Sequence, residues 1–198
     1  MSTRVQCPTV EDNLKLRRLL RYLKSSKDIA LTLEAEPSRS IQVSAYVDAS
    51  YGVHADCKSH TGVVITLGKG AIFVGSRKQR INTKSSTEAE LVGISDSLSM
   101  VIWCRSFVKF QTSFRNPAIL MQDNKSTIRL AETGRSNAEK TRHIAIRYFW
   151  IKDRISSNEV EIRYCPTDDM IADIVTKPLT GAKFIYLRSL LLNCICEV

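Results

Sequence analysis

The chain has 198 residues, of which 43% are hydrophobic and 25% are charged. This length and composition predict one globular domain with an appendage, and they exclude a disordered tail, a collagen-like repeat and a coiled coil. The formal net charge of +9 favours an anionic partner, although a basic surface can also serve solubility alone. We expect no membrane helix, no secretory signal and reduced cysteines, which together predict an intracellular protein.

The first 40 residues predict a helix, a short strand and a boundary. Leucines recur near helical spacing over residues 11–24, and residues 29–33 are typical of a short strand. The polar segment 34–40 contains a proline, so it is the best candidate for a domain boundary.

A hairpin-rich sheet is predicted to follow this boundary. Residues 41–47 alternate between apolar and polar side chains, as a half-buried strand does. Two apolar, β-branched runs, 61–67 and 71–76, are joined by a Gly-Lys-Gly segment. A single Gly-x-Gly between two strands indicates a hairpin turn rather than a phosphate cradle.

The second half of the chain alternates helices with strands. Strands are predicted over residues 117–121 and 160–164. Helices are predicted over residues 85–110, 126–132, 137–155 and 182–192, with another starting at Pro166. Three successive strands followed by this alternation predict an α/β fold, in which helices flank a mixed central sheet.

Four carboxylates lie at the ends of predicted elements: Asp48 and Asp123 end strands, and Glu90 and Asp173 begin helices. In a sheet of this class, strand ends and helix starts gather at one edge. Carboxylates that converge there repel one another, and their hard oxygen atoms favour Mg²⁺ or Mn²⁺. Two such ions, about 4 Å apart, can activate a water and stabilise the leaving oxygen in phosphodiester hydrolysis.

Each carboxylate also has a purely structural interpretation. The two strand-end aspartates can be ordinary turn residues, and Asp173 can be a first-turn acid favoured by the helix dipole. Glu90 fits a capping box with Thr87, but Ser85 and Glu88 fit the same box earlier in the helix. If Ser85 caps the helix, Glu90 is free to point at a metal.

Six motifs, in register, resemble the ribonuclease H domain of copia-type retrotransposon polyproteins. They are YVDAS (46–50), KSHTG (58–62), KSSTEAEL (84–91), QDNKS (122–126), KTRHI (140–144) and IADIVTKPL (171–179). The likeness covers residues 41–192, and residues 1–36 resemble the end of the reverse transcriptase that precedes this domain. It implies a piece of a longer polyprotein, or a gene left by a decayed element. The polymerase's paired aspartates are absent, so DNA synthesis is not expected.

The resemblance implies a ribonuclease H-like fold and endonucleolytic cleavage of the RNA strand in an RNA–DNA hybrid. Asp48, Glu90, Asp123 and Asp173 match the family's catalytic and metal-binding carboxylates, with two Mg²⁺ or Mn²⁺ ions as the cofactors. Glu90 is preferred to Glu88 because the apolar Leu91 follows it. The expected partners are the hybrid and the reverse transcriptase domain of the parent polyprotein.

Polar and basic residues beside these carboxylates are candidates for nucleic-acid contacts. A hybrid displays 2′-hydroxyls in a wide, shallow minor groove. Five side chains are candidates for contacts with those groups, although some of them can instead only cap helices. They are Lys84, Ser85, Ser86, Asn124 and Ser126. Side chains placed to hold backbone phosphates are Arg77, Lys78 and Arg80.

His143 has two interpretations, a proton shuttle near the site or a surface residue at a helix N-terminus. The family often has an acid two residues later and a second histidine further on, where this chain has Ala145 and Phe149. These departures weaken the functional interpretation of the segment but leave the four carboxylates intact.

Three alternatives remain. An integrase has 35 residues between its second aspartate and its glutamate, and Asp123 and Glu159 have that spacing. We interpret this as coincidence, because Glu159 opens a predicted strand instead of lying on a helix. The chain can also be an inert or co-opted nucleic-acid-binding remnant of a decayed retrotransposon, or a structural appendage of a polymerase.

Overall fold

The structure, a computed structural model, describes residues 5–35, 41–113, 115–133 and 142–194. Its contacts divide the chain into two units, Met1–Ala30 and Leu31–Val198. The first unit contains helix α1 (Val10–Ser25), which is capped by Thr9 and whose side chains, apart from the half-buried Asp12, are all exposed. The helix predicted over residues 11–24 is therefore present, and its leucines face outward.

The second unit begins at residue 31 because residues 31–35 bond to it. The Thr32 amide donates to the Leu192 carbonyl at 2.8 Å, and Glu34 forms a single β-bridge with Lys69. The predicted strand over 29–33 was wrong, since these residues pair with no neighbouring strand along their length.

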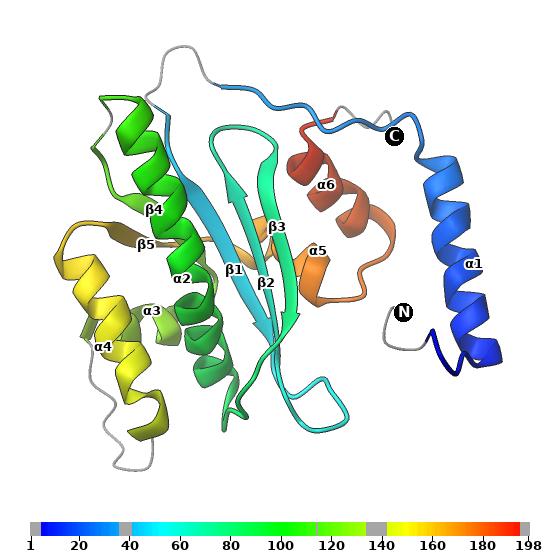
Figure 1. Cartoon of the computed structure of the whole chain (residues 1–198), viewed down its shortest axis with the longest axis horizontal. Coiled ribbons are helices and arrows are strands. Elements are labelled where there is room, and N and C mark those ends of the chain that lie inside the picture. Colours follow the sequence, from blue (N-terminus) through cyan, green and yellow to red (C-terminus); the bar gives the residue numbers. More distant parts are fainter. Residues whose placement is uncertain (1–4, 36–40, 114, 134–141, 195–198) are drawn as a thin grey trace. The chain divides into compact units, whose positions relative to one another are not determined.

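A five-stranded mixed sheet forms the centre of the second unit, in the order β3-β2-β1-β4-β5 (Figure 1). Strands β1 (Ser44–Ser50), β2 (His60–Thr66) and β3 (Ala71–Lys78) are antiparallel neighbours. Strands β4 (Ala118–Gln122) and β5 (Val160–Tyr164) extend the sheet in parallel with β1. The predicted α/β fold with a mixed central sheet is confirmed.

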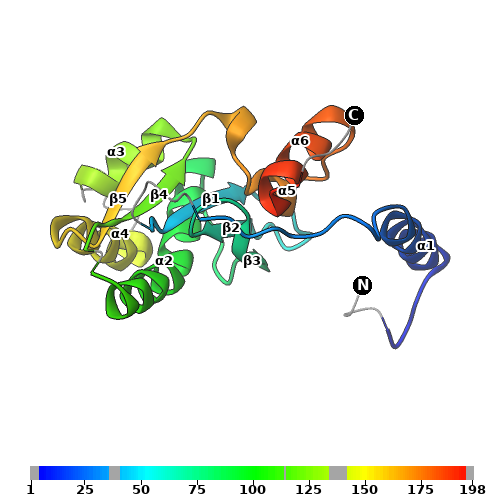
Figure 2. The same ribbon diagram turned by 90° about the horizontal axis from the view of Figure 1, so that it is seen from above.

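Helices cover both faces of this sheet, and Figure 2 shows the two groups from above. On one face lie α2 (Ser86–Gln111), α3 (Lys125–Thr133) and α4 (Arg142–Ser156), which share a core with Val43, Ala45 and Val47 of the β1 segment. On the other face lie α5 (Asp173–Thr176) and α6 (Gly181–Leu192), which pack near Tyr46. The helix predicted from Pro166 is instead a 3₁₀ turn, η3 (Thr167–Asp169), followed by the single turn of α5.

Helix α2 is the central helix of the domain. Among the described residues, it is the one helix long and apolar enough to cross a membrane by length and composition. Half of its most apolar stretch of 18 residues is buried, and the side chains of Leu91, Ile94 and Leu98 are completely buried in the core. This burial is what the core helix of a globular domain shows.

The alternation of side chains along β1 decides where Asp48 points. Val43, Ala45 and Val47 face α2, so Tyr46 and Asp48 project to the opposite side, where α5 lies. Strands β1 and β4 are parallel neighbours, so their carboxyl ends meet at one edge. Asp48, two residues before the end of β1, and Asp123, the residue after β4, are therefore brought together.

Candidate active site

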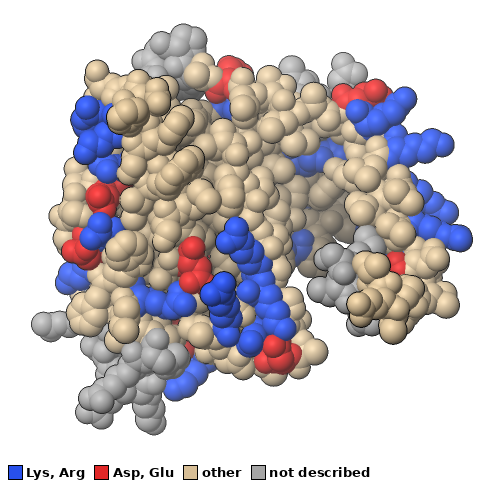
Figure 3. Space-filling view, viewed as in Figure 1, with Lys and Arg blue, Asp and Glu red and all other residues tan. Residues whose placement is uncertain are grey.

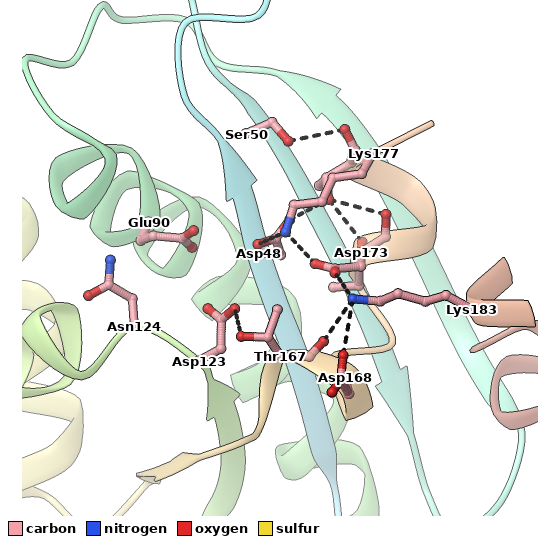
Figure 4. Close-up of polar contacts among 12 residues, drawn as sticks. Asp48, Ser50, Glu90, Asp123, Asn124, Thr167, Asp168, Asp173, Lys177 and Lys183 are labelled. Carbon is pink, nitrogen blue, oxygen red and sulfur yellow. Dashed lines mark hydrogen bonds and ion pairs between the residues drawn. The ribbon is translucent and has the colours of Figure 1, made fainter. Parts of the chain in front are cut away.

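Three of the four predicted carboxylates form one cluster, the acidic triad Asp48, Glu90 and Asp123 (Figure 4). One carboxylate oxygen from each lies within 4.8 Å of the others. Asp48 is 2% exposed and Glu90 is 5% exposed, whereas Asp123 is half-buried and gives the cluster its opening to solvent. The triad thus joins β1, the start of α2 and the residue after β4.

The local sequence of α2 explains why Glu90 is available. Ser85 caps the helix, and its Oγ accepts from the Glu88 amide at 3.2 Å. Glu88 turns back, and its Oε2 accepts from the Lys84 amide at 2.8 Å. Ser85 and not Thr87 is therefore the cap, although Glu88 accepts from the Lys84 amide and not from the Ser85 amide that a complete capping box would use. This cap leaves Glu90 facing Asp48 and Asp123.

A buried amide, which the sequence reasoning did not single out, supports the triad. Gln122 is fully buried, and its Nε2 donates to Glu90 Oε2 at 3.3 Å and to the Val47 carbonyl at 3.4 Å. Its Oε1 accepts from the Asn124 amide at 3.0 Å. The only signal for this role was the position of Gln122 directly before Asp123, at the end of a buried strand.

Burial and crowding of charge disfavour ionisation in the triad. Burial, followed by the charge of Asp48, raises the pKa of Glu90 to about 9. Burial also raises the pKa of Asp48, against the opposing effects of a hydrogen bond from Thr176 and the charge of Lys177. A divalent cation would reverse both effects by compensating the charge. The hard, oxygen-only donor set fits Mg²⁺ or Mn²⁺.

The fourth predicted carboxylate, Asp173, lies outside the triad and is neutralised by two lysines. It is 1% exposed, and its oxygens lie 2.6 Å from Lys177 Nζ and 3.1 Å from Lys183 Nζ. Lys177 also reaches Asp48 Oδ1 at 3.3 Å, so its ammonium bridges the two aspartates (Figure 4). Asp173 is therefore connected to the triad through a lysine.

Two threonines that the sequence reasoning did not single out complete the contacts. The Thr176 hydroxyl donates to Asp48 Oδ2, and the Thr167 hydroxyl donates to Asp123 Oδ2 at 3.1 Å. The hydroxyl of Ser50 holds the Thr176 carbonyl at 3.1 Å, which fixes α5 against the end of β1. Each triad aspartate thus has a hydroxyl partner from the segment 167–176.

Residues proposed to read the hybrid divide into helix caps and exposed side chains. Ser85 caps α2, and the Oδ1 of Asn124 accepts from two amides of the first turn of α3, at 3.0 and 3.2 Å. Lys84, Ser86 and Ser126 are exposed near the triad in the chain. These three side chains therefore reach the solvent.

The basic residues at the end of β3 are exposed and close together. Arg77, Lys78 and Arg80 line a cavity of about 300 Å³ beside α2, and Figure 3 shows basic side chains gathered over this end of the strand. Lys78 is paired with Asp56 at 2.8 Å. The two arginines have no ion pair with the described residues, so their charge is available to an anion.

Two further sequence hypotheses concern α4 and β5. His143 lies in α4, but its side chain falls outside the described part of the structure. Glu159 pairs with Arg154 at 2.8 Å, and its carbonyl accepts from the Ala118 amide, at the start of β4. Asp123 follows the other end of that strand. The integrase-like spacing therefore assembles no site, and its interpretation as coincidence is confirmed.

Comparisons with known proteins relate this chain to transposon polyproteins. No family model matches it. It is 29% identical over 186 residues to the retrovirus-related Pol polyprotein from transposon RE1 of Arabidopsis thaliana, covering 93% of this chain and 12% of the relative. It is 28% identical over 167 residues to the corresponding polyprotein from transposon TNT 1-94 of Nicotiana tabacum, covering 84% of this chain and 12% of the relative.

Among solved structures, LC11-RNase H1, isolated from compost by a metagenomic approach, matches with a TM-score of 0.50 and 15% sequence identity. The match covers 69% of this chain and 93% of that chain. The second unit therefore has a ribonuclease H-like fold, with the acidic triad at the strand-end edge of its sheet. By sequence, the chain is homologous to retrovirus-related Pol polyproteins of transposons, and it spans about 12% of the length of these curated relatives.

Proposed function

We propose that this domain is a metal-dependent endoribonuclease of the ribonuclease H type, which cuts the RNA strand of an RNA–DNA hybrid. The observation that carries the proposal is the acidic triad at the strand-end edge of a ribonuclease H-like sheet. Three carboxylates, two of them nearly inaccessible to water, repel one another in the absence of a cation. Such an arrangement is costly to the fold and is what a divalent metal site requires.

The residues around the site have distinct parts in this function. Asp48, Glu90 and Asp123 are the proposed ligands of one Mg²⁺ or Mn²⁺, and Asp48 with Asp173 would hold a second ion. When bound, two such ions activate a water and stabilise the leaving oxygen of the phosphodiester. Gln122 orients Glu90 through its hydrogen bond, and Thr176 orients Asp48 in the same way.

The partner surface is proposed to be the basic group at the end of β3. Arg77 and Arg80 are exposed, so their guanidinium groups can contact backbone phosphates. Such contacts make the affinity for the hybrid depend on salt concentration. The exposed Lys84 and Ser86 lie six and four residues before Glu90, and the exposed Ser126 lies three residues after Asp123. These positions suit side chains that contact a 2′-hydroxyl. The homology to Pol polyproteins supports a reverse transcriptase domain as the second partner.

The proposal is tested with a hybrid labelled in one strand at a time and incubated with Mg²⁺. We expect cleavage of the labelled RNA strand and none of the DNA strand. Asp48→Asn should slow cleavage by on the order of 10²-fold or more, because it removes a proposed ligand charge. The control is Asp153→Asn, the same change at an exposed site on α4.

Binding of the hybrid, measured in parallel, separates this function from its alternative. If the unaltered protein binds the hybrid but cuts it no faster than Asp48→Asn, the domain is a nucleic-acid-binding module without turnover. If it neither binds nor cuts at low salt, both proposals fail and a structural role remains.

A further inference from the structure

The charges of Asp48 and Asp173 are balanced by lysines, whereas those of Glu90 and Asp123, the other two residues of the triad, are not. Asp48 and Asp173 are 2% and 1% exposed, and two ammonium groups, of Lys177 and Lys183, contact them. No comparable cation contacts Glu90 or Asp123 among the described residues. The part of the site formed by Glu90 and Asp123 therefore needs a cation, whereas the part formed by Asp48 and Asp173 already contains the lysine ammonium groups.

The position of the Lys177 ammonium is that of a bridging cation. It contacts one oxygen of each aspartate, at 3.3 Å from Asp48 and 2.6 Å from Asp173 (Figure 4). Lys177 and Asp173 are four residues apart, and the Lys177 amide donates to the Asp173 carbonyl at 2.9 Å, which fixes their spacing. The lysine therefore lies between the two carboxylates that would share a second divalent ion.

The second lysine is placed differently. Lys183 comes from α6 and contacts Asp173 Oδ2 at 3.1 Å and the Thr167 carbonyl at 3.3 Å, but it forms no contact with Asp48 among the described residues. If Lys177 moved away, Asp173 would keep one positive neighbour, and Asp48 would lose the one ammonium that contacts it in the described part of the chain. The side chain of Lys177 is 37% exposed, so its ammonium has a route to solvent.

We propose that Lys177 is a resident cation that bridges Asp48 and Asp173 in the metal-free protein, and that a second divalent ion displaces it. The inference deepens the metal site of the function proposed above and rests on it. In this scheme the triad binds the first ion, because Lys177 contacts only one oxygen of Asp48 and contacts neither Glu90 nor Asp123. The second ion binds only when the Lys177 ammonium leaves both aspartates. The affinity for the second ion is therefore lowered, because the ion must replace the lysine's contacts with these aspartates. Lys177 is thus a positioning residue that sets the order of metal binding.

The test measures Mn²⁺ binding and thermal unfolding, with no nucleic acid present. The full chain should bind one Mn²⁺ at low concentration, counted by electron paramagnetic resonance of the free ion. Lys177→Met should bind two at the same free Mn²⁺. In EDTA it should unfold roughly 4–10 °C below the unaltered protein, because two buried carboxylates lose their shared cation, and Mg²⁺ should restore most of that loss.

Three further variants make the result specific. Lys183→Met removes the other lysine and should still bind one Mn²⁺, whereas Lys177→Arg keeps the charge and should behave as the unaltered protein. The double variant Asp173→Asn with Lys177→Met removes both charges, so it should fold in EDTA and bind one ion. A loss of stability in this double variant that Mg²⁺ does not restore would show that Lys177 acts by packing, and would overturn the proposal.

Equal Mn²⁺ stoichiometry in Lys177→Met and the unaltered protein would also overturn it, as would a loss of thermal stability that Mg²⁺ leaves unchanged. Hybrid cleavage is a separate readout. A protein that exchanges Lys177 for Mn²⁺ but cuts no hybrid refutes the proposed function alone. A protein that cuts the hybrid but shows no exchange refutes only the role of Lys177.

Discussion

Gly62→Ala should displace α5 from the sheet although it substitutes none of the proposed ligands. Gly62 lies on β2, directly opposite Asp48 of β1. A Cβ added there would lie 2.5 Å from Thr176 Cγ2, 2.8 Å from Val175 Cγ2 and 3.0 Å from the Ala172 carbonyl oxygen. The first two atoms are short, branched side chains and the third is backbone, so rotation of one flexible side chain cannot relieve the contact.

The segment cannot retreat freely, because two hydroxyls hold its carbonyls. Ser50 donates to Thr176 O at 3.1 Å, and Ser76 donates to Val175 O at 2.8 Å. Overpacking of this kind lowers the free energy of unfolding by roughly 1–3 kcal/mol. Alanine has less conformational entropy than glycine in the unfolded chain, which offsets about 0.4–1 kcal/mol of this loss. For a chain of this size, we expect the midpoint of thermal unfolding to fall by about 2–8 °C.

The assay combines thermal unfolding with amide hydrogen exchange of residues 173–177. Gly62→Ala should speed exchange at the Lys177 amide, which donates to Asp173 O in α5. Gly75→Ala is the matched control, since its Cβ would meet Val63 Cγ1 at 2.9 Å, on the other face of the sheet. That variant should lose stability but leave exchange in α5 unchanged. Wild-type stability and exchange in Gly62→Ala would refute the packing argument.

Three other predictions concern the site and its surface. In EDTA, the raised pKa of Glu90 means that the folded state holds this proton more tightly than the unfolded state. The free energy of unfolding should therefore fall as pH rises from about 4.5 toward 9, by up to about 1.4 kcal/mol per pH unit. Urea unfolding across this range should show the decline, and Glu90→Gln should flatten it; a flat profile in the unaltered protein would contradict the burial argument. Ser85→Ala should cost about 1 kcal/mol, because the Glu88 amide loses its cap, and Ser85→Asp should recover it in the same assay. Replacing both Arg77 and Arg80 with alanine should lower the salt slope of hybrid binding by roughly 2, as expected for two lost phosphate contacts; an unchanged slope would place the hybrid elsewhere.

The sequence predicted those features that depend on short-range patterns. Asp48 and Asp123 follow apolar runs that form neighbouring parallel strands, so their meeting at one edge follows from the fold class. The Ser85 hydroxyl caps the Glu88 amide within one turn of α2, and that local bond leaves Glu90 free. The sequence therefore predicts that the three carboxylates of the triad lie close together.

The features that escaped prediction depend on contacts between distant segments. Thr176 and Lys177 are 128 and 129 residues from Asp48 in the chain, and no periodicity in the sequence connects them. The role of Asp173 as an ion-pair partner of two lysines follows from the docking of α5 and α6 beside β1. Residues 29–33 have strand-like composition, but Thr32 bonds to the carbonyl of Leu192, at the end of α6, instead of to a strand.

The central claim is that the acidic triad performs metal-dependent cleavage of the RNA strand. The most direct measurement is the single-turnover rate constant for that cleavage at saturating Mg²⁺, in the unaltered protein and in Asp48→Asn, Glu90→Gln and Asp123→Asn. We predict that each triad variant slows the rate by on the order of 10²-fold or more, that EDTA abolishes it, and that Asp153→Asn leaves it unchanged. A wild-type rate in any triad variant, or RNA cleavage that persists in EDTA, would contradict the account.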